Sequence, residues 1–152
     1  MKSRIYHTNS EDETIALGEK IASELPAKSV VLLIGQLGAG KTTLAKGIVK
    51  GLGAANPEDV SSPTFTLIHE YGPGVYHIDL YRLDTPEQVA TLGLEEIFDR
   101  RAIVLIEWGE RFPELMPSDR IEIRLRSDGE NSREIALTTQ ARSTMESALP
   151  PN

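Results

Sequence analysis

The sequence predicts an α/β fold in which parallel strands are buried on both faces. Two continuous apolar runs, residues 30–34 and 102–107, are typical of such strands because neither face of the sheet meets water. A glycine-rich loop, residues 35–40, joins the first run to a helical stripe formed by Leu44, Ile48 and Leu52. A strand, a glycine loop and a helix in this order are the arrangement of a phosphate-binding turn.

The first helix is predicted from its cap. Ser10 and Glu13 form a capping-box pattern that begins a helix ending near Leu25, and Pro26 stops it. We expect this helix to turn its smaller and aliphatic side chains inward, namely Ile15, Ala16, Ile21, Ala22 and Leu25.

Turns and alternation predict the later elements. Gly72-Pro73-Gly74 indicates a hairpin between strands at residues 65–71 and 75–80. Pro86 begins a helical stretch to about Asp99, interrupted near Gly93. Apolar and polar residues alternate over 121–125, which predicts a half-exposed, edge-type strand that pairs with residues 133–139.

Composition limits the classes of function. The 152 residues suit one domain, 1–152, with a weakly ordered tail from about residue 141. Without cysteine there is no disulfide, thiol catalysis or cysteine zinc site. No apolar run approaches the ~20 residues of a membrane span, and the N-terminus lacks a signal-peptide core, so we expect no membrane contact. The cytoplasm is expected because nucleoside triphosphates, the ligands predicted below, are found there. The net charge of −7 argues against a free-standing nucleic-acid binder.

Residues 35–42 match the pattern G-x-x-x-x-G-K-[ST], the P-loop of nucleoside triphosphate binding. Its glycines allow backbone N–H groups to point inward at a helix N-terminus, which carries partial positive charge. Lys41 is expected to reach the β- and γ-phosphates, and the Thr42 hydroxyl to bind Mg²⁺. The pattern therefore predicts ATP or a related nucleotide as the ligand.

Two acidic residues close predicted strands. Asp79 ends residues 75–79 and Glu107 ends the run from Ala102, and ligands of open α/β sheets bind at the carboxyl ends of strands. Hydrolysis needs a carboxylate near Mg²⁺ and a group that positions water. Periodicity leaves open which of the two acids contacts the metal, and each also has an ordinary reading as a helix cap or a solvated side chain.

Three further features have a functional and a plain reading. Residues 61–66 are similar to a switch loop in which a Thr hydroxyl or a backbone carbonyl senses the γ-phosphate and its Mg²⁺. Ser and Pro before a strand are also routine loop chemistry. His77 is expected to pack or hydrogen-bond in its strand rather than act as a base. Trp108 is expected to be a buried anchor, with stacking or partner contact as the alternative.

Taken together, the motifs resemble the TsaE family of bacterial tRNA threonylcarbamoyladenosine biosynthesis ATPases. The segments that carry the resemblance are residues 35–43, 62–66 and 77–82 together with Glu107-Trp108. It implies a P-loop NTPase three-layer fold, with a mixed, largely parallel sheet and helices on both faces. It also implies ATP and Mg²⁺ as cofactors, and ATP hydrolysis that supports modification of adenosine 37 in tRNAs reading codons that begin with A.

The resemblance also implies partners and roles. The family acts on the TsaB–TsaD complex, in which TsaD is the transferase, so tRNA is met only indirectly. Carried over, Lys41, Asp79, Glu107 and Thr64 are catalytic, with Thr64 as part of the switch, and Thr42, Glu107 and Asp79 are metal ligands. The nucleotide-binding residues are Gly35, Gly38, Ala39, Gly40, Lys41, Thr42, Thr43 and Arg133. Two positions depart from the family pattern: Gln36 stands where Asp is common, and Ser132 precedes Arg133 where Gly is common.

Other functions are less well supported by the residues. No Asn-Lys-x-Asp segment is present to read a guanine edge. A small-molecule kinase would use Asp79 as base and needs an arginine-rich lid, whereas Arg120, Arg124 and Arg126 follow a strand pattern. A nucleotide-binding assembly module without turnover is the third class.

Overall fold

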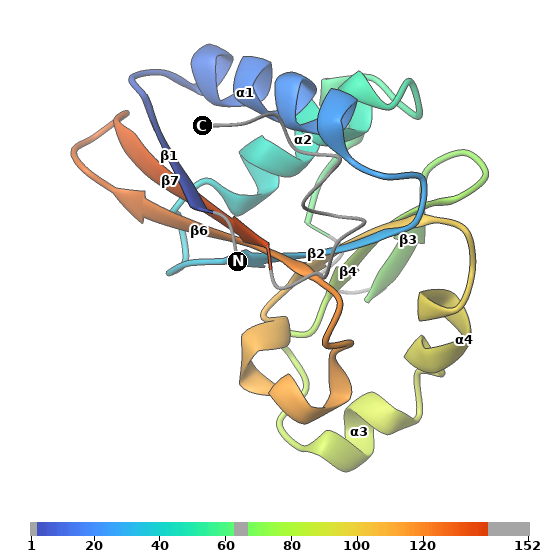
Figure 1. Cartoon of the computed structure of the whole chain (residues 1–152). Coiled ribbons are helices and arrows are strands. Elements are labelled where there is room, and N and C mark those ends of the chain that lie inside the picture. The colour runs from blue at the N-terminus through green and yellow to red at the C-terminus, as the bar shows by residue number, and fades with distance from the viewer. Residues whose placement is uncertain (1–2, 63–66, 140–152) are drawn as a thin grey trace.

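The computed structural model describes residues 3–62 and 67–139, which build a seven-stranded sheet with helices on both faces (Figure 1). The strands are Ser3–Thr8 (β1), Ser29–Ile34 (β2), Ile68–Glu70 (β3), Val75–Asp79 (β4), Ile103–Glu107 (β5), Ile121–Ser127 (β6) and Arg133–Thr139 (β7). They lie in the order β1-β7-β6-β2-β5-β4-β3. The expected switch residue Thr64 and the expected tail from residue 141 lie outside the described residues.

The middle of the sheet is parallel and both of its ends are antiparallel. β2 pairs in parallel with β5 and β6, and β4 pairs in parallel with β5. β3 joins β4 antiparallel, and β7 and β1 extend the other end antiparallel. The expectation of a largely parallel sheet therefore holds for the four central strands only, because two short turns send the chain back beside itself at β3–β4 and β6–β7.

The expected edge position of residues 121–125 is wrong. These residues belong to β6, which lies inside the sheet between β7 and β2. Glu122 is buried between Arg120 and Arg124, at 2.8 and 2.9 Å, so a polar side chain is accommodated by ion pairs rather than by an open edge. Alternation reports which face is accessible and does not report the position of a strand in the sheet. One edge is formed by β1, which the sequence analysis did not anticipate.

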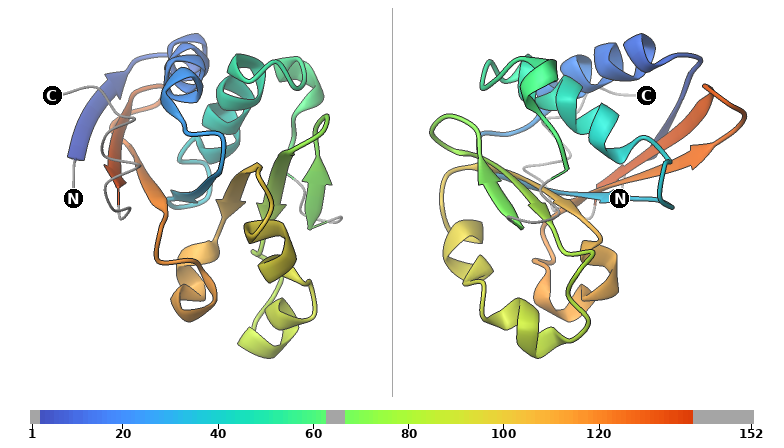
Figure 2. Two further views of the ribbon diagram at one scale, coloured as in Figure 1. Left: turned by 45° about the vertical axis from the view of Figure 1, so that its right-hand side comes forward. Right: turned by 180° about the vertical axis from the view of Figure 1, so that it is seen from behind.

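Two helices, Glu11–Glu24 (α1) and Lys41–Gly51 (α2), cover one face of the sheet (Figure 2). The predicted start of α1 is confirmed, since the Ser10 side chain accepts a hydrogen bond from the Glu13 amide at 3.1 Å. Ile21 and Ala22 are buried as expected, whereas Ala16 is exposed. The buried stripe of α1 instead runs through Thr14, Leu17 and Gly18.

Glycines bring α1 and α2 into backbone contact. A Cβ atom at Gly18 would lie 2.6 Å from the Leu44 carbonyl oxygen, and one at Gly47 would collide with the Ile15 carbonyl oxygen. The two helices therefore pack more closely than larger side chains allow. This contact determines where the N-terminus of α2 lies above the sheet.

The opposite face is covered by short helices, Pro86–Ala90 (α3) and Leu94–Phe98 (α4), separated as expected at Gly93, which has φ +69°. Alternate residues of β2 contribute to the two cores: Val31 and Leu33 face α1 and α2, while Val30 and Leu32 face the other layer. Burial on both faces is the physical reason for the continuous apolar run.

Candidate functional site

The glycine-rich loop, residues 35–40, leads from the end of β2 directly into α2. Gly38 and Gly40 have φ values of +80° and +103°, in the left-handed region that favours glycine. A Cβ atom at Gly35 would lie 2.6 Å from the Leu125 carbonyl oxygen, so the loop also begins against β6 without room for a side chain. The loop thus directs the N-terminal end of α2 toward the carboxyl ends of the central strands.

Lys41 is the first residue of α2, and only 5% of it is exposed. Its Nζ atom donates a hydrogen bond to the Gly35 carbonyl oxygen at 2.7 Å and lies 3.6 Å from the centroid of the Trp108 ring. Burial lowers the pKa of Lys41, and the negative charges of Glu107, Glu110 and Asp79 oppose that shift. The ammonium is therefore held inside the loop by a carbonyl and an aromatic face.

Glu107 closes β5 and is buried. Its Oε2 atom accepts hydrogen bonds from the Thr42 hydroxyl at 3.2 Å and from Nε2 of His77 at 2.6 Å. Thr42 lies on α2 and His77 on β4, so three separate elements meet at one carboxylate oxygen. His77 is buried as expected, but its hydrogen bond runs to the neighbouring strand β5 and not within its own strand. That His77 does not act as a base stays a prediction.

Asp79 closes β4 directly opposite Glu107 in the parallel register. Its Oδ2 atom accepts a hydrogen bond from the Ser62 hydroxyl at 2.6 Å, and its Oδ1 atom accepts one from the Tyr81 amide at 2.8 Å. The predicted pair of strand-end acids therefore lies together at the carboxyl edge of the sheet. Ser62 connects this pair to the segment that precedes the expected switch residue.

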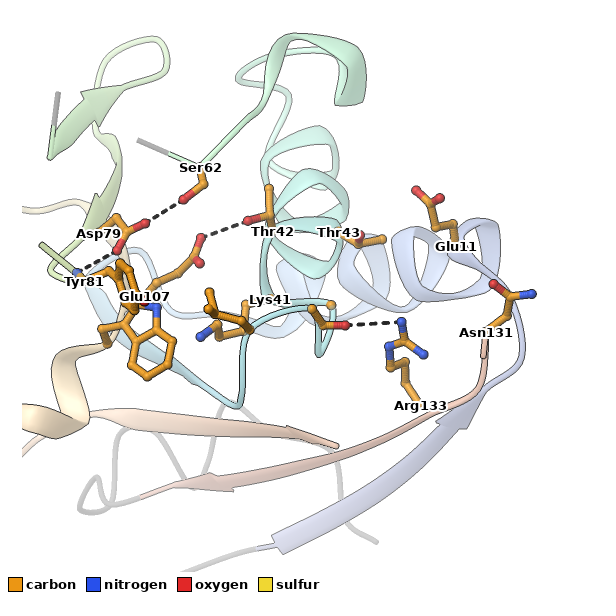
Figure 3. A pocket seen from close by; sticks show the side chains of 14 residues that line it. Glu11, Lys41, Thr42, Thr43, Ser62, Asp79, Tyr81, Glu107, Asn131 and Arg133 are labelled. Carbon is orange, nitrogen blue, oxygen red and sulfur yellow. Dashed lines mark hydrogen bonds between the residues drawn. The ribbon is translucent and has the colours of Figure 1, made fainter. Parts of the chain in front are cut away.

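A cavity of about 510 Å³ opens over these groups (Figure 3). Its walls come from the glycine loop, α2, the ends of β4 and β5, and the start of β7: Glu11, Leu37, Gly38, Gly40, Lys41, Thr42, Thr43, Ser62, Asp79, Tyr81, Glu107, Trp108, Asn131 and Arg133. The volume lies in the usual range for small-molecule sites. A hydroxyl and two carboxylates beside a lysine form a donor set that suits a hard cation such as Mg²⁺ with a phosphate group.

Arg133 lies at the end of the cavity remote from the two acids, as Figure 3 shows. Its Nη2 atom donates a hydrogen bond to the Gly38 carbonyl oxygen at 3.4 Å. Glu11 and Asn131 line the same end, and the sequence analysis missed both of them. Glu11 is the first residue of α1 and Asn131 lies between β6 and β7, so only the folded arrangement reveals that both face the cavity.

Aromatic and acidic groups next to the lysine complete the site. Trp108 has φ +68° and is half-buried, with its ring 5.1 Å from that of Tyr81. The two rings are tilted relative to each other, and Trp108 packs against the apolar core while it also lines the cavity. The expected buried anchor is therefore found only in part, and stacking on a ligand stays a prediction. Burial raises the pKa of Glu110, and its Oε1 atom has no hydrogen-bond partner among the described residues. Tyr81 belongs to the segment 77–82 that carries the family resemblance but was given no role, and Glu110 was not identified from the sequence.

Comparisons with known proteins identify the family of the chain. A family model described as "Threonylcarbamoyl adenosine biosynthesis protein TsaE" matches residues 8–135. The chain belongs to the TsaE family. The protein named tRNA threonylcarbamoyladenosine biosynthesis protein TsaE from Bacillus subtilis is 39% identical over 141 residues, covering 91% of this chain and 87% of that protein. The protein of the same name from Nostoc sp. is 45% identical over 135 residues, covering 84% and 81%.

A solved structure supports the same TsaE assignment. The crystal structure of Bacillus subtilis YdiB superimposes with a TM-score of 0.78 at 33% sequence identity, covering 97% of this chain and 91% of that one. This TsaE chain therefore belongs to a family involved in tRNA threonylcarbamoyladenosine biosynthesis. Among residues 3–62 and 67–139, no helix has both the length and the apolar character needed to cross a bilayer.

Proposed function

We propose that this TsaE-family chain is a Mg²⁺-dependent ATPase that supports threonylcarbamoylation of adenosine 37 in tRNAs reading codons that begin with A. It acts on the TsaB–TsaD complex and does not transfer the group itself. One observation carries the proposal: Lys41, Thr42 and the two strand-end acids Asp79 and Glu107 line a single cavity at the N-terminus of α2. Each supplies a function that triphosphate hydrolysis requires.

The phosphate end of the proposed site is formed by the loop and Lys41. In the described arrangement the lysine ammonium occupies the loop itself, hydrogen-bonded to the Gly35 carbonyl oxygen. Phosphate oxygens carry full negative charge and attract an ammonium more strongly than a carbonyl does. We therefore expect Lys41 to exchange Gly35 for the β- and γ-phosphates, and the first amides of α2 to donate to the same oxygens.

Thr42 and Glu107 are the residues that would hold Mg²⁺, and Asp79 is the second acidic group of the site. When bound, the ion neutralises charge on the phosphate oxygens. The Asp79 carboxylate lines the cavity. Hydrogen bonds from the Ser62 hydroxyl and the Tyr81 amide fix its orientation. We assign Asp79 to orienting the attacking water, because a carboxylate restrained at both oxygens presents its lone pairs in a fixed direction.

The nucleoside end is assigned to Arg133, Asn131 and Glu11. Thr43 separates them from the acids, so a nucleotide with its phosphates on the loop extends its base toward them. Asparagine and glutamate side chains carry the acceptors and donors that base edges and ribose hydroxyls need. The absence of an Asn-Lys-x-Asp segment from the sequence supports adenine over guanine.

The arginines that a small-molecule kinase would need for a lid are engaged elsewhere. Arg120 and Arg124 are ion-paired with Glu122, and Arg126 is ion-paired with Asp128 and Glu134. These side chains are attached to the β6 and β7 region rather than to a lid over the cavity. This observation favours an ATPase over a kinase.

One assay separates the ATPase from the kinase and from an assembly module without turnover. ADP formation and phosphate release from ATP are measured with the chain alone, with a panel of hydroxyl metabolites, and with TsaB–TsaD added, using Glu107→Gln as the matched inactive control. The proposal expects Mg²⁺-dependent release that the partners stimulate. A kinase would form ADP only with a metabolite and without matching phosphate release, because the phosphoryl group passes to the metabolite. Nucleotide binding without ADP formation or phosphate release under all three conditions would indicate an assembly module.

A further inference from the structure

We propose that His77 is a positioning residue that holds the Glu107 carboxylate in its working orientation. The inference rests on the proposed function, because it takes Glu107 to be a ligand-binding acid of the cavity. The Nε2 atom of His77 lies 2.6 Å from Oε2 of Glu107, a short hydrogen bond between two residues with 0% and 3% exposure. His77 itself does not line the cavity; it acts through Glu107.

The location of the pair explains how His77 reaches Glu107. His77 lies two residues before Asp79 on β4, so both side chains point to the α2 side of the sheet. In the parallel register Asp79 is opposite Glu107, and His77 is opposite Leu105. The hydrogen bond therefore runs diagonally from β4 to β5, and it restrains a long side chain that ends a strand.

The direction of the hydrogen bond identifies His77 as the donor. An ionised carboxylate only accepts hydrogen bonds, so Nε2 of the ring carries the hydrogen. The other ring nitrogen, Nδ1, is buried and has no hydrogen-bond partner among the described residues. Burying an unpaired polar nitrogen is unfavourable, and an aliphatic side chain of similar size would avoid it. The histidine thus uses its one polar contact on Glu107, which a residue serving packing alone would not need.

Thr42 and His77 both donate a hydrogen bond to Oε2 of Glu107, but we assign them different roles. The Thr42 hydroxyl lines the cavity, and in the proposed function it serves the metal and the phosphates. His77 is shielded from the cavity, so its hydrogen bond is available throughout the nucleotide cycle. Buried partners of metal-binding side chains fix the orientation of the ligand, and their removal commonly weakens metal affinity by about 10- to 100-fold.

The sharpest test compares two amides that differ only in reach. In His77→Gln the side-chain nitrogen is separated from Cβ by the same number of bonds as Nε2, so the donor to Glu107 is kept. In His77→Asn the side-chain nitrogen is separated from Cβ by only as many bonds as Nδ1 of the histidine. It is therefore too far from the Glu107 carboxylate to donate a hydrogen bond. His69, the partner of His77 across the β3–β4 pairing, is exposed, and His69→Asn is the matched control.

The readout is the affinity for a non-hydrolysable ATP analogue, measured by calorimetry with Mg²⁺ and with EDTA. We expect His77→Asn to lose about tenfold or more of the enhancement that Mg²⁺ gives. His77→Gln and His69→Asn should keep it, and the affinity in EDTA should stay close to wild type. Equal enhancement in His77→Gln and His77→Asn, whether retained or lost, would overturn the positioning role.

A second measurement reads the tautomer of His77 in the wild-type protein and does not depend on the His77 variants folding. The chain has three histidines, so the imidazole nitrogens of the wild-type protein are resolvable by ¹⁵N NMR. The expected result is a His77 ring protonated at Nε2, with a signal that changes in Glu107→Gln while the His69 signal does not. A ring protonated only at Nδ1 would overturn the inference. Wild-type protein that shows no Mg²⁺-dependent nucleotide affinity would instead refute the proposed function, whatever the tautomer.

Discussion

The Lys41 ammonium lies 3.6 Å from the centroid of the Trp108 ring. The positive charge that we expect to bind phosphate therefore lies over an aromatic ring that also lines the cavity. Lys41 begins α2 and Trp108 follows the end of β5, and these two elements are joined again by the hydrogen bond from Thr42 to Glu107. Lys41 and the oxygens of Thr42 and Glu107 that we expect to bind Mg²⁺ are thus held by the same pair of elements. A substitution at Lys41 is therefore expected to change metal binding at Thr42 and Glu107, and a substitution at Glu107 to change phosphate binding at Lys41.

Replacing Lys41 with alanine should remove tight ATP binding while the fold remains. The side chain contacts the loop and Trp108 rather than the apolar cores, so its loss removes phosphate contacts. Hydrogen bonds to charged groups are worth about 1.5–3 kcal/mol, which corresponds to a loss of about 10- to 100-fold in affinity. Calorimetry of the folded variant checks this, with Lys50→Ala at the other end of α2 as the control. Unchanged ATP affinity in folded Lys41→Ala would remove the P-loop assignment.

Substitutions of Glu107 and Asp79 should affect nucleotide affinity and turnover differently. Glu107→Gln is expected to weaken both the Mg²⁺ dependence and the nucleotide affinity, because it changes the carboxylate that Thr42 contacts. Asp79→Asn is expected to lower turnover more than binding, because we assign Asp79 to orienting water. Calorimetry gives the affinities, and phosphate release with TsaB–TsaD present gives the turnover. Wild-type hydrolysis by both variants would refute a catalytic role for either carboxylate.

The pH dependence of binding should follow the lowered pKa of Lys41. Only the ammonium pairs with phosphate, so affinity should fall as the pH rises through a pKa below the ordinary 10.5. Stability should change in the opposite direction. The unfolded chain binds the proton more tightly than the folded chain, so the contribution of Lys41 to the free energy of unfolding rises with pH. Calorimetry and thermal unfolding across pH check both trends, and Lys41→Met should lack them.

The helix contact that positions α2 should not tolerate a methyl group. Glycine to alanine within a helix ordinarily stabilises by about 0.5–1 kcal/mol. At Gly47 the new Cβ atom would collide with the Ile15 carbonyl oxygen, so backbone must move. Overpacking of this kind costs about 1–3 kcal/mol and outweighs the helix preference. Chemical unfolding should show lower stability for Gly47→Ala and little change for Gly129→Ala, where the nearest atoms lie 3.9 Å from the added carbon.

The partner complex should distinguish the nucleotide states. A switch driven by the γ-phosphate requires that TsaB–TsaD bind the triphosphate form with a different free energy from the diphosphate form. We expect at least about fivefold tighter binding with an ATP analogue than with ADP, the lower end of common coupling energies. Thr64→Ala should narrow the difference. Calorimetry or pull-down experiments showing equal affinity in both states would contradict the switch, even if hydrolysis were observed.

The elements that the sequence by itself determined are those specified by local chemistry. The helix cap at Ser10, the hairpin turn at residues 72–74 and the two continuous apolar runs each depend on neighbouring residues alone. The pattern at residues 35–42 placed Lys41 and Thr42 together for the same reason. The two strand-end acids were identified individually, because the end of a buried run is visible along the chain.

Only the tertiary structure decided which of these residues meet. The parallel register places Asp79 opposite Glu107, and the return of β7 to β6 brings Arg133 to the glycine loop. The sequence-based expectation of an edge position for β6 was wrong, because alternation does not encode neighbours in a sheet. The sequence predicted only that His77 is packed in its strand. The β4–β5 pairing places it next to Glu107. Contacts between residues distant in sequence depend on strand order and register, and no local pattern specifies either.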